Sequence, residues 1–247
     1  MHIREIKFNH RREFRIFGLQ RSGLHAITNW LIASLVEEGE DELVYLNFVN
    51  CNPVIKGSRF ISGDSMPSLP DNLRRPMDKL KGTLILGFEE WDAAKWVRNL
   101  DTGVESTNVF VTRDLRDVFA SRLARLCDPK SEFSIPDTTL KTWGEWMTDK
   151  DKDGRYKMLN YYRDYWPAPK NTVVLEYDGW LSSEEYRAEK AEELDIKFHN
   201  LGMDKVSKYG GGSSFDKLPE AGCSRWSKFA DHPMMIEFLE QLGKADS

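Results

Sequence analysis

Apolar and polar positions alternate along the chain in a way that separates short strands from helices. Strands are predicted where aliphatic, β-branched and aromatic residues cluster, at about residues 14–17, 43–49, 83–88, 107–112 and 172–177. Segments with helical periodicity or irregular composition lie between them. This alternation is typical of an α/β fold, so we predict a central parallel β-sheet flanked by helices on both faces.

The stretch from Phe14 to Leu31 combines a buried strand, a turn and an amphipathic helix. Gly18 and Gly23 bracket the turn, where glycine lets the backbone bend without a side-chain clash. Apolar residues then recur at helical spacing, so a helix is predicted to begin near Leu24. The unpaired N–H groups and the positive dipole end of such a helix favour a bound anion, and phosphate is the usual occupant.

The spacing from Gly18 to Gly23 matches the first half of the nucleotide-triphosphate loop GxxxxGK[ST]. The second half is missing, because Leu24 and His25 stand where the lysine and the hydroxyl residue would be. The loop thus keeps the anion-binding backbone but lacks the groups that hold a magnesium-bound triphosphate, which argues against ATP hydrolysis.

Inside the same loop, Arg21 and Ser22 offer a fixed cation and a small hydroxyl that can meet a phosphate or a sulfonate. Taken alone, the segment also fits an ordinary strand-to-helix turn without a ligand. The two interpretations are separated by a second segment further along the chain.

Residues 108–126 repeat the pattern of a strand followed by a helix. Arg113 follows the predicted strand, and Ser121 lies eight residues later, about two helical turns on. Both are therefore predicted to line a crevice at the carboxyl edge of the sheet, where ligands bind in open α/β folds. The arginines at positions 116 and 122 are interpreted instead as part of a solvated helix face.

Together these segments resemble the sulfotransferases that use 3′-phosphoadenosine 5′-phosphosulfate (PAPS), which have a P-loop-like three-layer sandwich fold. Residues 20–26 are similar to the family's 5′-phosphosulfate loop, PKSGTTW. Residues 113–125 are similar to its 3′-phosphate motif, RDxRDVxxSxxxR, and here the match is nearly complete. The resemblance covers about residues 13–228.

The first motif departs from the family pattern at several positions. Arg21 replaces the lysine, Leu24 and His25 replace the two threonines, and Ala26 replaces the tryptophan that would stack on adenine. If the resemblance holds, adenine packing must come from another part of the chain.

Two later stretches are similar to the family over shorter lengths. Residues 173–180, VVLEYDGW, resemble a late strand whose tyrosine lies beside the nucleotide, and residues 213–216 resemble a segment that contacts adenine. The resemblance would place Tyr177, Ser213 and Phe215 around the base, although core packing is an equal alternative for the two aromatic residues. The family's late Arg-Lys-Gly loop has no counterpart, but Arg225 could supply its charge.

The resemblance implies that PAPS is the cofactor and that adenosine 3′,5′-bisphosphate (PAP) is its product. The residues expected to bind it are Gly18, Gln20, Arg21, Ser22, Gly23, Leu24, His25, Arg113, Ser121, Tyr177, Ser213, Phe215 and Arg225.

Sulfuryl transfer needs cations where negative charge builds on the departing nucleotide, and a base when the acceptor is a hydroxyl. Arg21 is the predicted cation. Glu89 is our preferred base, because it follows an apolar strand at the place where family members carry a catalytic histidine or glutamate. A solvated surface glutamate is the alternative for Glu89, and His25 is the rival base, although a lone histidine at a helix start more often packs.

Composition agrees with a single sulfotransferase-like domain over residues 1–247. The net charge of −5 argues against a general nucleic-acid surface. The three cysteines form no CxxC or cysteine–histidine cluster, so no metal site is predicted. No signal peptide or long apolar run is present, so we expect a cytoplasmic protein that does not insert into membranes. Residues 50–82 are predicted to form a long connection, either a substrate wall or a surface insertion.

The sequence therefore predicts a PAPS-dependent sulfotransferase acting on a hydroxyl or nitrogen of a small-molecule acceptor, and leaves the acceptor and the oligomeric state open. Two alternatives from other classes remain. One is a P-loop nucleotide or small-molecule kinase, against which the missing GK[ST] ending speaks. The other is a catalytically silent relative that binds the nucleotide without turning it over.

Overall fold

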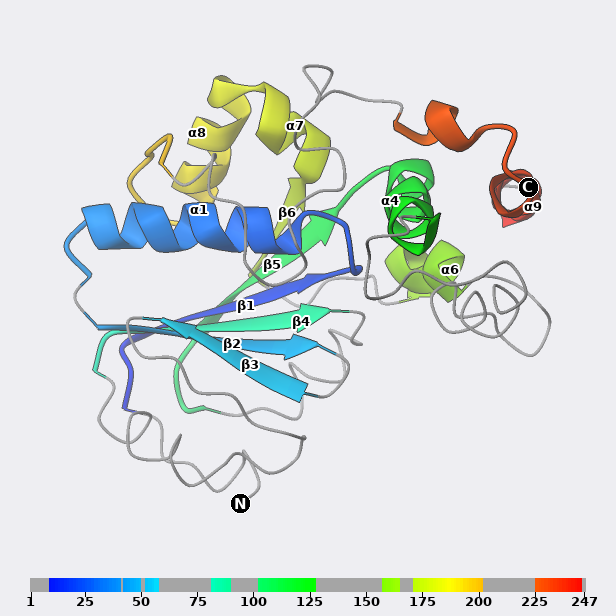
Figure 1. Ribbon diagram of the computed structural model, residues 1–247. Coiled ribbons are helices and arrows are strands. Elements are labelled where there is room, and N and C mark those ends of the chain that lie inside the picture. Colours follow the sequence, from blue (N-terminus) through cyan, green and yellow to red (C-terminus); the bar gives the residue numbers. More distant parts are fainter. Residues whose placement is uncertain are drawn as a thin grey trace. The chain divides into compact units, whose positions relative to one another are not determined.

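The structure is a computed structural model (Figure 1) that describes residues 9–40, 42–49, 52–57, 81–89, 102–127, 157–164, 171–201 and 225–245. The chain falls into two compact units, and each is described by itself. The first comprises residues 1–112 and 167–205, and the second comprises residues 113–166 and 206–247. The single domain expected from the sequence stays a prediction.

A six-stranded sheet forms the centre of the first unit. Its strands are β1 (Arg12–Gly18), β2 (Leu43–Val49), β3 (Asn52–Gly57), β4 (Thr83–Glu89), β5 (Ser106–Thr112) and β6 (Thr172–Glu176), in the order β3-β2-β4-β1-β5-β6. All neighbouring pairs are parallel except β2 with β3. The predicted α/β fold, with a central parallel sheet flanked by helices, is confirmed.

Two details of the strand prediction are wrong. Strand β3 lies within residues 50–82, which the sequence assigned to a connection. Pro53 obscured it, because proline lowers strand propensity and is tolerated mainly on edge strands such as this one. The last strand, β6, ends at Glu176, one residue before its predicted end, because Tyr177 already belongs to a helix.

Three helices of this unit, α1 (Leu24–Glu37), α7 (Tyr177–Ser182) and α8 (Glu184–Glu193), lie on the same side of the sheet (Figure 1). Strand residues that alternate with period two face them, and the shared core includes Phe14, Ile16, Tyr45, Ile85 and Val109. Two fully buried tryptophans join the helices to each other, with Trp30 of α1 edge-on to Trp180 of α7 at 6.2 Å between ring centroids. Burial of these large rings fixes α7 against α1, together with Tyr177, the residue that follows β6.

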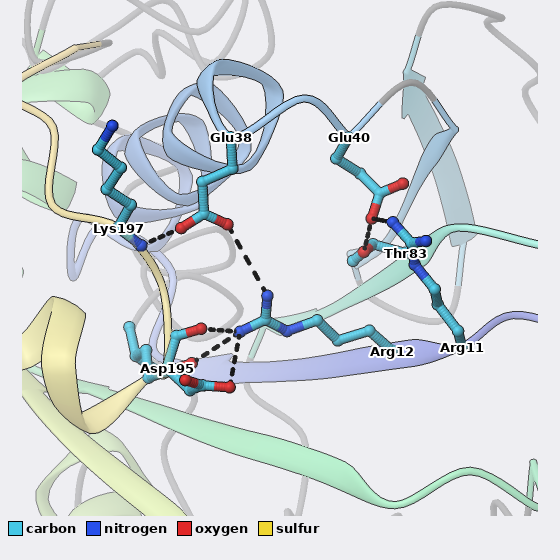
Figure 2. Close-up of polar contacts among 8 residues, drawn as sticks. Arg11, Arg12, Glu38, Glu40, Thr83, Asp195 and Lys197 are labelled. Carbon is cyan, nitrogen blue, oxygen red and sulfur yellow. Dashed lines mark hydrogen bonds and ion pairs between the residues drawn. The ribbon is translucent and has the colours of Figure 1, made fainter.

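Charged residues tie the start of β1 to the ends of two helices (Figure 2). Arg12 donates hydrogen bonds to the backbone carbonyls of Leu194, at 3.1 Å, and Asp195, just beyond α8. Its guanidinium also lies 3.9 Å from the carboxylate of Glu38, beyond the end of α1. Glu38 in turn accepts a hydrogen bond from the backbone N–H of Lys197. Arg12 thus links the start of β1, the end of α1 and the segment after α8, which are far apart in the chain.

A buried polar cluster lies on the other face of β1, around Glu13. The Glu13 side chain is fully buried and accepts hydrogen bonds from His10, at 2.8 Å, and from Arg15 and Thr102. Burial alone would raise the pKa of Glu13, but the hydrogen bond from His10, the charge of Arg15 and the remaining hydrogen bonds hold that pKa below its usual value. The carboxylate therefore joins β1 to the segment that precedes β5.

The second unit contains the helices α4 (Leu115–Cys127), α6 (Lys157–Asp164) and α9 (Pro233–Ala245) and the 3₁₀ helix η2 (Arg225–Phe229). Asp114 caps α4, because its carboxylate accepts the backbone N–H of Arg116 at 2.8 Å. Stacked rings of Phe119 and Phe238, with centroids 4.1 Å apart, join α4 to α9. No helix among the described residues of either unit is long and apolar enough to span a membrane.

Replacing Glu13 by glutamine should lower the free energy of unfolding by about 1–3 kcal/mol at neutral pH, since a buried charged acceptor is lost while its donors remain. The pKa of Glu13 is depressed in the folded state, so its contribution is present above the unfolded pKa of a glutamate and is lost as the pH falls through the folded pKa. Urea denaturation of Glu13→Gln at several pH values tests this. The difference from the unmodified protein should shrink in acid, whereas Glu37→Gln, on an exposed site of α1, should change little at any pH.

Candidate functional site

The loop between β1 and α1 takes the conformation that its two glycines suggest. Gly18 ends β1, and Gly23 stands immediately before α1 with φ 96° and ψ 6°, in the left-handed region. Arg21 also has a positive φ of 75°, which is uncommon for a residue with a side chain and points to a backbone held by its surroundings. The predicted helix start near Leu24 is confirmed, and Leu24 itself is buried in the core.

Both glycines are also required by close contacts. A Cβ at Gly18 would lie 2.9 Å from Oγ of Ser22 and 3.2 Å from Cβ of Val111 in β5. A Cβ at Gly23 would lie 2.0 Å from the ring of Tyr177, the first residue of α7. The Tyr177 ring stacks on Trp180 at 5.7 Å and is 7% exposed, so it cannot move aside easily. Tyr177 thus forms one wall of the loop.

The start of α1 has the features of an anion cradle. No side chain caps the helix. The N–H of Ala26 donates to the backbone carbonyl of Gly23 at 2.9 Å, and the N–H groups before it receive no acceptor from a cap side chain. The hydroxyl of Ser22 is fully buried and has no hydrogen-bond partner among the described residues. A buried hydroxyl left unsatisfied is costly, and an anion in the loop would satisfy it.

The side chains of the two candidate bases, Glu89 and His25, are in direct polar contact. Strand β4 pairs in parallel with β1 and sets Glu89 opposite Gly18, at the carboxyl edge of the sheet. His25 lies in the first turn of α1, and its Nε2 is 2.8 Å from Oε1 of Glu89. The side chain of Glu89 is 5% exposed and that of His25 is 21% exposed. The alternative of a solvated Glu89 is therefore wrong.

Residues that the sequence did not single out lie behind this pair. Tyr45 of β2 is fully buried; burial, and then the nearby charge of Glu89, raise the pKa of its hydroxyl. The Thr28 hydroxyl of α1 donates to the backbone carbonyl of Leu24 at 2.7 Å. Only the strand order, which sets β2 beside β4, brings Tyr45 close to Glu89.

The predicted 3′-phosphate residues belong to the second unit. Arg113 directly follows β5 in the chain; its backbone N–H donates to the hydroxyl of Tyr162 in α6 at 3.1 Å, and its side chain is buried. Ser121 lies two turns into α4 and is 2% exposed.

Arg225 opens η2, and this helix packs on α4. The backbone N–H of Trp226 donates to Oδ1 of Asp117 in α4 at 3.0 Å, and the guanidinium of Arg116 lies 5.3 Å from the centroid of the Trp226 ring. The side chain of Arg225 is 6% exposed. These contacts bring Arg225 to the helix that carries Ser121, which its position in the sequence did not indicate.

The two arginines assigned to a solvated helix face differ. The side chain of Arg116 is 42% exposed and forms an ion pair with Asp114. Although burial acts in the opposite direction, the hydrogen bonds and charge of Arg116 hold the pKa of Asp114 below its usual value. For Arg122 the interpretation is wrong, because this residue is only 2% exposed. The long aliphatic part of an arginine can be buried on a face that its charge alone would assign to solvent.

Some expected residues contribute less or lie elsewhere. Gln20 lies in the turn after β1 and is partly exposed. Ser213 and Phe215 lie outside the described residues. Within the described ranges, no group of three histidine, cysteine, aspartate or glutamate side chains could hold a metal ion.

Comparison with solved structures finds a protein with a similar α/β fold. The crystal structure of mouse sulfotransferase SULT7A1 complexed with PAP is similar to this chain with a TM-score of 0.56 and 9% sequence identity. The match covers 95% of this chain and 84% of the mouse chain. At this identity the likeness shows a sulfotransferase-like α/β fold. No protein-family model and no curated protein matches the chain.

Replacing Gly23 by alanine should lower the free energy of unfolding by roughly 2–5 kcal/mol, because left-handed strain of about 1–2 kcal/mol adds to a clash with the buried Tyr177 ring. Gly39→Ala is the matched control, since Gly39 has a φ of 93° but open space around its Cβ position. Denaturation of both variants separates the two effects. Equal losses at the two positions would show that Tyr177 does not constrain the loop.

Proposed function

We propose that this protein transfers a sulfuryl group from PAPS to a hydroxyl or nitrogen of a small-molecule acceptor. The observation that carries the proposal is the buried Ser22 hydroxyl without a partner, in a glycine-bracketed loop at the uncapped start of α1. The fold shared with a sulfotransferase and the similarity of residues 20–26 and 113–125 to the family's two motifs support it. PAPS supplies the activated sulfuryl group.

The loop of the first unit would hold the 5′ end of PAPS. Ser22 would donate its hydroxyl, and the N–H group of Gly23 would bind a phosphosulfate oxygen, as helix starts bind anions. The N–H group of Ser22, which the sequence also suggested for this role, already donates to the backbone carbonyl of Leu19 at 3.0 Å. Arg21 would stabilise the negative charge that builds on the departing phosphate, a role that usually contributes most in transfers of this kind. Gly18 and Gly23 would keep the loop in its binding shape, because a Cβ at Gly18 would crowd Ser22 and a Cβ at Gly23 would collide with Tyr177.

The remaining assignments rest on the family motifs. Arg113 and Ser121 would bind the 3′-phosphate, which distinguishes PAPS from ATP, and Arg225 would add a third positive or polar contact. Tyr177 would lie near the nucleotide as well as form the wall of the loop. Ser213 and Phe215 would contact the adenine.

A base is needed for a hydroxyl acceptor, and Glu89 and His25 are the two candidates. A positioned base contributes about 10²- to 10⁴-fold to the rate of such a transfer. The cytoplasmic location expected from the sequence belongs to the same proposal, as does the preference for a small-molecule acceptor.

Calorimetry with PAP tests the cofactor directly. The unmodified protein should bind PAP, and Arg113→Ala should weaken binding at least tenfold, because charge-assisted hydrogen bonds to a phosphate are lost. Arg11→Ala is the control, since this exposed arginine at the amino edge of the sheet also removes one positive charge. If the unmodified protein released no heat with PAP, or if Arg11→Ala weakened binding as much as Arg113→Ala, the proposal would fail.

Arg21→Ala should slow turnover with PAPS more than it weakens binding of PAP, because the Arg21 charge is needed most where charge develops during transfer. Comparison of the turnover number with the calorimetric affinity measures the two effects. Equal losses in both would remove Arg21 from a role in the transition state.

A further inference from the structure

We infer that His25 is the base, acting through its Nδ1, that Glu89 is its positioning residue, and that the acceptor is a hydroxyl compound. The inference rests on the proposed function and differs from the preference for Glu89 that the sequence suggested. Its starting point is the close contact between Nε2 of His25 and Oε1 of Glu89, which are 2.8 Å apart.

That contact assigns the proton on the imidazole ring, because an unprotonated nitrogen 2.8 Å from a carboxylate oxygen would be repelled by it. A carboxylate only accepts hydrogen bonds, so Nε2 of His25 must be the protonated nitrogen and Nδ1 carries the lone pair in the neutral ring. Nδ1 is buried and has no hydrogen-bond partner among the described residues. A buried acceptor without a partner is uncommon, and one explanation is that a substrate supplies the partner.

Burial decides which member of the pair meets the acceptor. Glu89 is 5% exposed, and one of its oxygens already contacts His25. The fully buried Tyr45 of β2 lies close enough for the Glu89 charge to act on its hydroxyl, so the carboxylate is enclosed on the side of β2. His25 is 21% exposed and belongs to the first turn of α1, two residues from the Gly23 N–H that would bind the phosphosulfate. The imidazole therefore stands between the enclosed carboxylate and the anion loop.

The pair repeats the division of labour of a serine hydrolase triad, in which a buried carboxylate fixes the tautomer of a histidine that moves the proton. Nδ1 of His25 takes the proton of the acceptor hydroxyl as the acceptor oxygen bonds to sulfur. The bond from sulfur to the 5′-phosphate oxygen breaks, and its electron pair leaves with the phosphate. Glu89 then faces an imidazolium, whose charge it stabilises until the proton passes to solvent.

This arrangement selects a chemical class of acceptor. An amine attacks through a lone pair that is already free and can lose its proton afterwards, whereas a hydroxyl must lose its proton as the new bond forms. A base held in one tautomer next to the sulfuryl site therefore suits a hydroxyl compound, and water is its simplest example.

Nitrogen NMR of isotope-labelled histidine tests the tautomer without any cofactor. The His25 signals, identified by their absence in His25→Asn, should show a protonated Nε2 and an unprotonated Nδ1 in the neutral ring. Glu89→Gln should produce a mixture of tautomers, because the amide can donate as well as accept. Glu37→Gln is the control and should leave the signals unchanged. A proton on Nδ1 in the unmodified protein would overturn the inference.

Transfer from radiolabelled PAPS to 2-naphthol, 2-naphthylamine and water tests the roles in turnover. His25→Asn should lower the rate to 2-naphthol and to water by about 10²- to 10⁴-fold and change the affinity for PAP less than threefold. Added imidazole should restore part of the rate to His25→Ala but not to Glu89→Ala. His199→Asn is the matched control, since only the backbone carbonyl of His199 holds a described partner, Trp30.

The outcomes separate this inference from the proposed function. A protein that does not bind PAP refutes the proposed function, whatever the tautomer of His25. Three results would overturn the inference alone in a protein that binds PAP. They are unchanged transfer in His25→Asn, no transfer to water or 2-naphthol by the unmodified protein, and faster transfer to 2-naphthylamine than to 2-naphthol.

Discussion

The parallel pairing of β1 with β4 is the constraint on which the candidate site depends. It sets the last residue of β1, Gly18, directly beside the last residue of β4, Glu89. Because both strands run in the same direction, the loop that follows one and the side chain that ends the other meet at the carboxyl edge, the usual ligand edge of such sheets. A sheet slip of one residue would turn Glu89 to the opposite face, away from α1 and His25.

The loop itself is held from two sides. Its left-handed residues, Arg21 and Gly23, follow from the need to turn sharply from β1 into α1. Tyr177 closes the other side, and the stacked Trp180 and the buried Trp30 fix that ring against α1. The aromatic core that stabilises the fold is thus continuous with the wall of the loop, so loop geometry and stability are coupled.

The sequence predicted the parts of the fold that depend on local pattern. The strands, the start of α1 and the loop glycines follow from periodicity and backbone freedom, which a single segment contains. Contacts made by strand order could not be predicted: β4 lies between β1 and β2 in space although β2 precedes it in the chain, and only this order joins His25, Glu89 and Tyr45. The edge strand β3 and the burial of Arg122 were not predicted for a related reason. A proline or a charge in the sequence is a weak guide to strand formation or burial when neighbouring elements determine the environment of the residue.

If the loop binds an anion as proposed, the Glu89 carboxylate beside it raises an electrostatic difficulty, which the pairing of Glu89 with His25 reduces. An isolated Glu89 charge near Gly18 would repel a phosphosulfate in the loop, and partial burial would strengthen that repulsion. Nε2 of His25 lies 2.8 Å from the carboxylate, and the proton inferred on Nε2 would offset part of the Glu89 charge. In a P-loop that binds magnesium and a triphosphate, a lysine and a hydroxyl occupy the positions of Leu24 and His25. In this chain a leucine that packs in the core and a histidine paired to Glu89 occupy those positions, so the loop keeps its backbone N–H groups but lacks the side chains that hold a magnesium-bound triphosphate.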